Sequence, residues 1–271
     1  MHKIKEKKVL AEKTIMMKIV APEIAKKARA GNFVILRIDE KGERIPLTIA
    51  DHDLETITII FLVVGRTTED LSKLNKGNNI LDIAGPLGNP IEYEKYGTVV
   101  FVGGGLGIAA IYPQLKALKK DNKVISIIGA RKKELLFLID EIKQFSDRVI
   151  VCTDDGSFGR KGFVTEALRD LINKEKIDRV VAIGPPVMMK AVSDVTRDKK
   201  IKTIVSINTI MVDGIGMCGS CRVRVNNEIK FACVDGPEFD AHQVDWDEFL
   251  KRNLRYKEEE HECMLTKNDG K

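Results

Sequence analysis

The sequence predicts a small antiparallel β-barrel, followed by an α/β domain with a parallel sheet and then by a cysteine-rich segment. Short β-branched runs extend to about residue 97, strands and helices alternate regularly over 98–210, and the regular pattern ends where the cysteines gather. Turn residues between short β runs are typical of small barrels, whereas alternating strands and helices indicate a parallel sheet covered by helices. We therefore expect divisions at 1–97, 98–210 and 211–271.

The barrel region contains four clear β-branched runs and one helical pattern. The expected strands are 33–38, 44–51, 56–64 and 78–85. The expected helix covers 67–77, with Thr67 or Thr68 as its N-cap. Arg44 begins an otherwise apolar strand, which an ordinary core would not select. It is either a ligand-binding cation or a plain surface charge.

From residue 98 the apolar runs alternate with amphipathic stretches of helical period. The expected strands are 98–105, 123–131, 147–155, 178–186 and 202–210, and the expected helices are 106–120, 132–145, 162–174 and 187–199. This order makes the strands parallel, so the loops at their carboxyl ends form the expected ligand site.

Composition excludes several classes of protein. The chain is 44% hydrophobic and 31% charged, without an apolar run long enough to cross a bilayer. Its charged start and its five cysteines favour a cytoplasmic, reducing location without a secretory signal. The net charge of +5 comes from interspersed charges rather than a basic face, which argues against nucleic acid. The four histidines are scattered, and we expect no catalytic acid or base among the side chains.

A glycine-rich turn follows the first parallel strand. Gly105, Gly107 and Ala110 fit the pattern G-x-G-x-x-A, in which the backbone can approach a pyrophosphate at a helix start. The same glycines would also suit a plain tight turn. No acidic residue ends the next strand to bind a ribose; Arg131 and two lysines stand there instead. We therefore expect a variant nucleotide site rather than a standard Rossmann domain.

Other candidate ligand groups lie at the ends of later strands and at the barrel helix. Asp154 and Asp155 follow the third parallel strand, where they would cap the next helix or bind ribose hydroxyls. Cys152, at the end of the same apolar strand, is expected to be a core thiol. Gly65 with the hydroxyls of Thr67 and Thr68 forms a second candidate phosphate site.

The C-terminal cysteines have the spacing of an iron–sulfur site with one substitution. Plant-type [2Fe–2S] proteins carry C-x4-C-x2-C and a distant fourth cysteine. This chain has Asp213 in the first position, followed by Cys218, Cys221 and Cys233. The spacing favours a [2Fe–2S] cluster with Asp213 as the first ligand. Zinc, with Cys263 as a fourth thiolate, and no metal at all are the alternatives.

Taken together, these motifs resemble the ferredoxin–NADP reductase superfamily over residues 4–240. "RIPLT" resembles its flavin motif, "VVGRTT" its second FAD loop, and "GGGLG" and "GPP" its nicotinamide-nucleotide loops. The C-terminal loop is similar to that of the dihydroorotate dehydrogenase electron-transfer subunit, although Asp213 replaces a cysteine. That exchange resembles the small subunits of NADH-dependent reduced ferredoxin:NADP oxidoreductase and of sulfide dehydrogenase.

The resemblance implies FAD, NAD(H) and a [2Fe–2S] cluster as cofactors. Arg44 would meet the FAD pyrophosphate, with Pro46, Leu47 and Thr48 along the isoalloxazine and ribityl chain. The full set of expected cofactor-binding residues is Arg44, Pro46, Leu47, Thr48, Val64, Gly65, Thr67, Thr68, Gly104, Gly105, Gly107, Ile108, Arg131, Asp154, Asp155, Gly184, Pro185 and Pro186. Cys152 beside the nicotinamide is a further possibility. The family favours NADH, although Arg131, Lys132 and Lys133 would suit a 2′-phosphate.

The resemblance also implies hydride exchange between NAD(H) and FAD, then single-electron transfer through the cluster to a partner. That partner would be a large flavoprotein subunit with iron–sulfur clusters, linked to ferredoxin and NADP by electron bifurcation. A self-sufficient NADH:acceptor reductase and a non-enzymatic redox sensor are the rival functions. Trp246, Phe249, Leu250 and Leu254 share one helical face, which packs either on this chain or on the partner.

Overall fold

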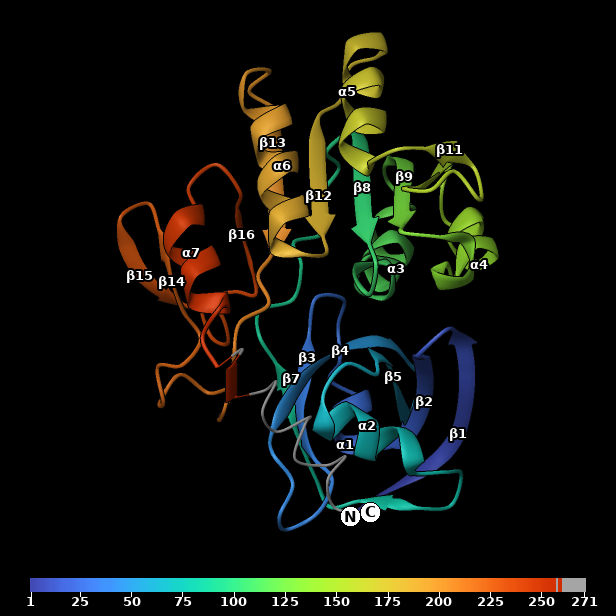
Figure 1. Cartoon of the computed structure of the whole chain (residues 1–271), viewed down its shortest axis with the longest axis vertical. Coiled ribbons are helices and arrows are strands. Elements are labelled where there is room, and N and C mark those ends of the chain that lie inside the picture. The colour runs from blue at the N-terminus through green and yellow to red at the C-terminus, as the bar shows by residue number, and fades with distance from the viewer. Residues whose placement is uncertain (257, 260–271) are drawn as a thin grey trace.

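The computed structural model describes residues 1–256 and 258–259, and within them it contains two large sheets and a small hairpin (Figure 1). Each large sheet has seven strands, and the two occupy separate halves of the molecule. The fold class predicted from the sequence, an antiparallel barrel-like sheet followed by a mostly parallel sheet, is confirmed.

The first sheet is antiparallel and curls into a near-barrel with the order β6-β1-β2-β5-β4-β3-β7. Its elements are β1 (His2–Ala11), β2 (Thr14–Val20), α1 (Pro22–Ala25), β3 (Phe33–Arg37), β4 (Ile45–His52), β5 (Thr56–Leu62), α2 (Arg66–Lys73), β6 (Asn79–Ile80) and β7 (Asp82–Leu87). The barrel interior is apolar and includes Met17, Ile57 and Phe61. The long strands β1 and β2 have no counterpart among the four runs singled out in the sequence.

The second sheet has the order β11-β10-β9-β8-β12-β13-β16, and all its pairings are parallel except that of β16. Its elements are β8 (Thr98–Gly104), α3 (Gly107–Leu118), β9 (Lys123–Ala130), η1 (Lys133–Leu135), α4 (Ile139–Gln144), β10 (Arg148–Thr153), β11 (Arg160–Lys161), α5 (Val164–Lys174), β12 (Arg179–Ile183), α6 (Pro186–Arg197) and β13 (Lys202–Ser206). Its α3 side shares an apolar cluster with the barrel residues Ala50 and Ile60. Residues from α5 and α6 belong to a second cluster.

Three local predictions need correction. The expected helix over 132–145 is a short 3-10 turn, η1, and then α4, because Leu138 adopts a φ of 56° and Leu136 and Phe137 turn into the core. The N-cap of α2 is Gly65, not a threonine. The expected strand over 78–85 divides into β6 and β7 around Leu81, whose N–H donates to the carbonyl of Ile38.

The chain after β13 forms a loop, the hairpin β14 (Arg222–Val225) and β15 (Glu228–Phe231), the strand β16 (Glu238–Asp240), and the helix α7 (Trp246–Asn253). Asn226 and Asn227 have positive φ values, as the tight hairpin turn requires. β16 pairs antiparallel with β13, so the C-terminal segment extends the second sheet. No helix among the described residues is long and apolar enough to cross a membrane.

One buried side chain makes four hydrogen bonds at the connection between the two sheets. Asn122, which is 8% exposed, accepts hydrogen bonds from the N–H groups of Tyr96 (2.7 Å) and Gly97 (3.1 Å). Its amide donates to the carbonyls of Glu94 and Leu118, both at 3.0 Å. The end of α3 is therefore tied to the entry of β8.

Asn122→Ala should lower stability, because it leaves two backbone N–H groups of the connection without their acceptor. We expect a loss of about 2 kcal/mol and a Tm decrease of roughly 4–8 °C in thermal unfolding followed by circular dichroism. Asn173→Ala, at an exposed position in α5, is the matched control and should leave Tm nearly unchanged. Equal Tm values for the two variants would contradict this role of Asn122.

Candidate functional site

A cavity of ≈ 350 Å³ lies where the near-barrel meets the second sheet. It brings together nine of the residues predicted from sequence. These are Pro46, Leu47 and Thr48 from β4, Gly104, Gly105 and Gly107 at the end of β8, and Gly184, Pro185 and Pro186 at the end of β12. The motif expected to hold a flavin therefore faces both loops expected to hold a nicotinamide nucleotide. Ile108, the next residue in α3, is fully buried behind this wall.

The two nucleotide loops are in direct backbone contact. A Cβ on Gly107 would overlap the carbonyl oxygen of Ile183, so only glycine lets the two loops approach this closely. Gly105 is different: its φ is +53° and nothing lies within 4 Å of where its Cβ would stand. The open backbone at Gly105 leaves room for a ligand at the start of α3, as a bound pyrophosphate requires.

Several cavity residues were not singled out from the sequence. They include Gly31, Phe33, Ile60, Leu62, Leu106, Ala109, Gln114, Ser206, Ile207, Asn208, Met211 and Pro237. Most are apolar or small and carry no chemical signal. Gln114 could have been found, because it is a polar residue on the buried face of an apolar helix.

Gln114 connects the cavity to a carboxyl group in β16. Its Nε2 donates a hydrogen bond of 2.6 Å to Oε1 of Glu238. Desolvation raises the pKa of Glu238 to about 7, and the hydrogen bond from Gln114 and the charge of Arg179 only partly oppose that shift. A titratable group of near-neutral pKa therefore lies directly behind the cavity wall.

The second candidate phosphate site lies at the start of α2, outside the cavity. The hydroxyl of Thr68, in the first turn of the helix, accepts hydrogen bonds of 3.0 Å from the N–H groups of Val64 and of the N-cap Gly65, as in a capping box. Thr67 donates to Glu43, which brings the residue before Arg44 to the same helix start. Arg44 is exposed and has no hydrogen-bond or ion-pair partner among the described residues. Nothing lies within 4 Å of a Cβ built on Gly65, so the residues fit a phosphate group there.

At the carboxyl ends of β9 and β10, polar groups gather beyond the cavity. Asp155 accepts hydrogen bonds from the N–H and the hydroxyl of Ser157, whose Oγ accepts from the N–H of Lys133. The two aspartates do not cap α5, whose N-cap is Phe163 and lacks a side-chain bond. Asp154 and Arg131 are both exposed at this edge. The arrangement suits an adenosine ribose.

Cys152 is buried in the sheet core, 1% exposed, and does not line the cavity. Burial raises the pKa of its thiol to about 11. Cys152 is therefore a core residue rather than a reactive group beside a nicotinamide.

The four predicted cluster ligands lie between β13 and β16, with Asp213, Cys218 and Cys221 on the loop before the hairpin and Cys233 directly after it. Cys221 and Cys233 are buried with their sulfurs 3.2 Å apart, and Cys218 is exposed. The Asp213 carboxylate accepts from the N–H groups of Ile215 and Cys218. Gly214 and Gly216 have positive φ values, and Gly214 packs directly on Ile35 and Leu87 of the near-barrel.

The donor set of this loop fits an iron–sulfur cluster. A Sγ–Sγ distance of 3.2 Å is too long for a disulfide. It approaches the separation of roughly 3.7 Å that two thiolates bound at about 2.3 Å to one tetrahedral metal require. Desolvation raises the pKa of Cys218, but hydrogen bonds, chiefly from Ser220, outweigh it and leave the pKa lowered. No group of three ligands is preformed at metal-binding distance among the described residues, and Cys263 lies outside them.

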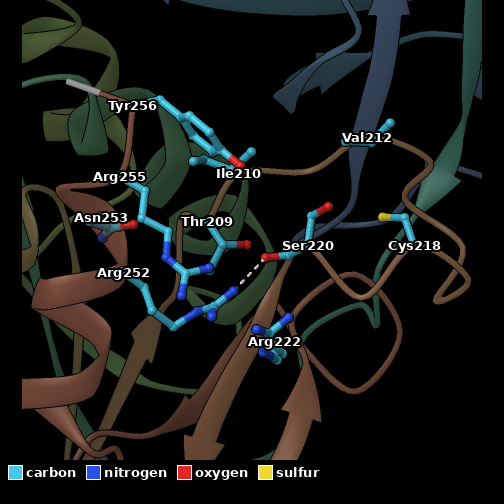
Figure 2. A pocket seen from close by; sticks show the side chains of 10 residues that line it. All are labelled: Thr209, Ile210, Val212, Cys218, Ser220, Arg222, Arg252, Asn253, Arg255 and Tyr256. Atoms are coloured by element: carbon cyan, nitrogen blue, oxygen red, sulfur yellow. Dashed lines mark hydrogen bonds between the residues drawn. The ribbon is translucent and has the colours of Figure 1, made fainter. Parts of the chain in front are cut away.

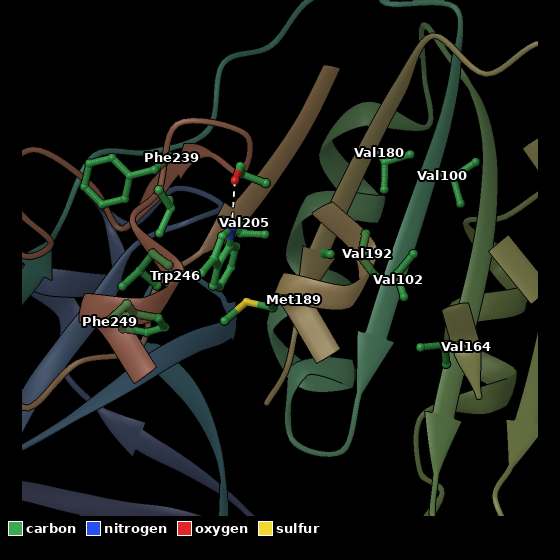
Figure 3. Close-up of a cluster of buried hydrophobic side chains, with 14 of the residues drawn as sticks. Val100, Val102, Val164, Val180, Met189, Val192, Val205, Phe239, Trp246 and Phe249 are labelled. Carbon is green, nitrogen blue, oxygen red and sulfur yellow. Dashed lines mark hydrogen bonds between the residues drawn. The ribbon is translucent and has the colours of Figure 1, made fainter. Parts of the chain in front are cut away.

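The exposed side of the loop borders a pocket of ≈ 400 Å³ lined by Cys218, Ser220 and three arginines (Figure 2). The helix α7 contributes Arg252 and Asn253 to this pocket, and its apolar face packs on its own chain. Trp246 and Phe249 turn toward Phe239 and Met189 in the core (Figure 3), and Phe249 is 1% exposed.

Of the two possibilities for the apolar face of α7, packing on this chain is therefore the one observed. Leu250 is half-buried, whereas Leu254, at the C-cap, is 56% exposed and lies outside that contact.

Two domain families match the chain. Residues 208–245 match the iron–sulfur cluster binding domain of dihydroorotate dehydrogenase B, and residues 101–194 match the oxidoreductase NAD-binding domain. A dihydroorotate dehydrogenase B (NAD(+)) electron transfer subunit homolog from Thermotoga maritima is 50% identical, over 96% of this chain and 93% of its own length. The chain belongs to the family of dihydroorotate dehydrogenase B electron transfer subunits and their homologues.

The electron transfer subunit from Clostridium perfringens is 31% identical, over 81% of this chain and 88% of its own length. Among solved structures, a chain of NADH-dependent reduced ferredoxin-NADP oxidoreductase is 48% identical, with a TM-score of 0.92 and 98% coverage of both chains. A ferredoxin NADP+ reductase from Neisseria gonorrhoeae with bound FAD and NADP has the same fold, with a TM-score of 0.61, 20% identity and coverage of 73% and 89%.

These likenesses confirm the superfamily, the oxidoreductase class and the cofactors expected from the sequence. This member of the electron transfer subunit family combines an FAD- and NAD-binding fold with an iron–sulfur cluster binding segment.

Alanine substitutions at Gly105 and Gly107 should distinguish the cost of a steric overlap from the cost of a strained backbone. Gly107→Ala must push the loops at the ends of β8 and β12 apart, and we expect it to cost more than about 3 kcal/mol and to abolish flavin reduction by NADH. Gly105→Ala has room and should cost only about 1 kcal/mol for its positive φ. Thermal unfolding and stopped-flow flavin absorbance measure both effects. Equal stability of the two variants would show that the contact at Gly107 is unimportant.

Proposed function

We propose that this chain is the small subunit of an electron-bifurcating heterodimer that links NAD(H) to ferredoxin and NADP through a large flavoprotein partner with iron–sulfur clusters. One observation carries the proposal: a single segment joins the cavity to the cluster loop. Ser206 and Met211 line the cavity, and Asp213 stands only two residues beyond Met211. The near full-length likeness to a chain of NADH-dependent reduced ferredoxin-NADP oxidoreductase supports the same assignment.

The two halves of the cavity would hold two flat rings against each other. Pro46, Leu47 and Thr48 would line the flavin, and Gly184, Pro185 and Pro186 would line the nicotinamide on the facing side. When bound, FAD exchanges a hydride with NAD(H) and converts between two-electron and one-electron transfer, while the cluster transfers single electrons. The apolar lining excludes water from between the rings, and the loop backbones position them. Hydride transfer of this kind needs no side-chain acid or base.

The remaining predicted residues have proposed roles at the ends of the two cofactors. Arg44, with the backbone of Val64 and Gly65 and the side chains of Thr67 and Thr68, would hold the FAD pyrophosphate. Gly105 and Gly107 would hold the NAD pyrophosphate at the start of α3.

Asp154 and Asp155 would accept hydrogen bonds from the adenosine ribose, and this carboxylate pair favours NADH over a 2′-phosphorylated nucleotide. Of the neighbouring cations, Lys132 is paired with Glu12 at 2.7 Å, and Lys133 lies 5.6 Å from the ring centroid of Phe158.

The function predicts a fixed order of reduction in the purified chain. Rapid anaerobic mixing with NADH should bleach the flavin first and the cluster afterwards, because hydride transfer starts in the cavity. NADH should act faster than NADPH at equal concentration. Faster reduction by NADPH would reverse the nucleotide assignment, and zinc without acid-labile sulfide would exclude the cluster.

Asp213 should behave as a cluster ligand. Asp213→Ala should reduce cluster content or change its EPR spectrum, whereas Asp213→Cys should retain the cluster with a shifted midpoint potential, because ligand identity sets the potential. Asp198→Ala removes an exposed carboxylate at the end of α6 and should change neither property. Identical spectra and potentials in all three variants would place Asp213 outside the ligand set.

A further inference from the structure

Three arginines converge on the pocket beside the cluster loop, and none of them forms an ion pair within the described residues. Arg222, Arg252 and Arg255 all line it (Figure 2). Arg252 donates to the carbonyl of Ser220 at 3.1 Å and Arg222 to that of Gly219 at 3.2 Å. No ion pair joins any of the three to a carboxylate among residues 1–256 and 258–259. By contrast, nearby Arg224 is paired with Glu248 at 2.7 Å.

The crowding of these cations affects Arg252 most directly. Desolvation, and then the charges of Arg222 and Arg255, lower the pKa of Arg252, and the charge of Glu248 only partly opposes that shift. Like charges held this close oppose one another unless an anion binds between them. The free chain therefore carries a concentrated positive site beside its cluster.

The pocket also contains an unsatisfied polar atom. Oγ1 of Thr209 is buried and has no hydrogen-bond partner. Every other buried side-chain nitrogen or oxygen in the described part of the chain has a partner. Thr209 lies beside the arginine side chains in the same pocket (Figure 2). A buried hydroxyl without a partner costs free energy, so an incoming acceptor oxygen would satisfy it together with the guanidinium groups.

The rim of the pocket is apolar, which favours a protein over a small anion as its occupant. Ile210, Val212 and Tyr256 line the pocket and are 41%, 48% and 58% exposed. Ile215 and Met217, on the cluster loop itself, are also exposed, with Met217 at 83%. Arginine and aromatic side chains surrounded by apolar area are typical of protein–protein contact sites.

We propose that this arginine pocket receives carboxylate side chains from the large flavoprotein partner and seats that partner against the exposed edge of the cluster at Cys218. The inference rests on the proposed function, because it assumes that the partner takes electrons from this cluster. The pairing would bring guanidinium and carboxylate groups together out of water, next to the route by which electrons leave.

Charge reversal at Arg255 tests this inference. The side chain of Arg255 makes no hydrogen bond or ion pair within the described residues, so Arg255→Glu should leave the flavin, the cluster EPR spectrum and reduction by NADH unchanged. Its Kd for the purified large subunit, measured by calorimetry at low salt, should rise at least tenfold. Arg255→Gln should fall between Arg255→Glu and wild type. Arg169→Glu, the same charge change at an exposed position of α5, should bind like wild type.

The alternatives give different results. If Arg255→Glu and Arg169→Glu bind the large subunit equally well, the arginine pocket does not contact it and the inference is wrong while the heterodimer stands. If the wild-type chain itself fails to bind at low salt, both proposals are wrong. Inorganic phosphate that binds wild type but not Arg255→Glu, with unchanged affinity for the large subunit, would reassign the pocket to a small anion.

Discussion

The close approach of the near-barrel to the α3 side of the second sheet is the constraint on which the rest of this structure depends. Residues of β4 and β5 share one apolar cluster with α3, β8 and β12. A salt bridge of 2.8 Å between Lys116 and Asp51 lies at the same contact. In the proposed function, hydride transfer would need the two rings within about 3–3.5 Å of each other, and the packing of the two sheets would set that separation.

The position of the C-terminal segment also depends on the contact between the near-barrel and the second sheet. It packs on the near-barrel through Gly214 and adds β16 to the second sheet, so it touches both halves of the molecule. Its apolar residues belong to one cluster with Phe33 and Ile35 of the near-barrel. The cluster loop is therefore fixed relative to the cavity, which a protein that transfers electrons over a short distance requires. Its outer side is left open, with an exposed cysteine and uncompensated arginines.

Charged side chains on the surface are either paired with an opposite charge or left without an ion pair. Many exposed lysines and arginines are paired with carboxylates, as in the pairs of Arg37 with Asp82 and Lys202 with Asp240. Such surface pairs contribute little to stability, but each pair cancels the net charge at its place on the surface. Arg44, at the proposed FAD phosphate site, and the three arginines beside the cysteines are among the cations without an ion pair within the described residues. The arginines beside the cysteines differ from scattered surface charges because three of them line one pocket, where an anionic partner is proposed.

The sequence alone was sufficient for the order of elements, the glycine turns and the cluster spacing, because these depend on local periodicity and on residues of special conformation. It identified the three motifs that meet in the cavity, from β4, β8 and β12, although they are far apart in the chain. It missed β1 and β2, whose alternating lysines and apolar residues give a weak strand signal, and it predicted one helix where Leu136 and Phe137 turn into the core. Only the tertiary structure placed Gln114 against Glu238, buried α7 on its own chain and gathered three arginines around Thr209. Such contacts join residues distant in sequence, and the packing of whole elements, rather than any local preference, decides which of them meet.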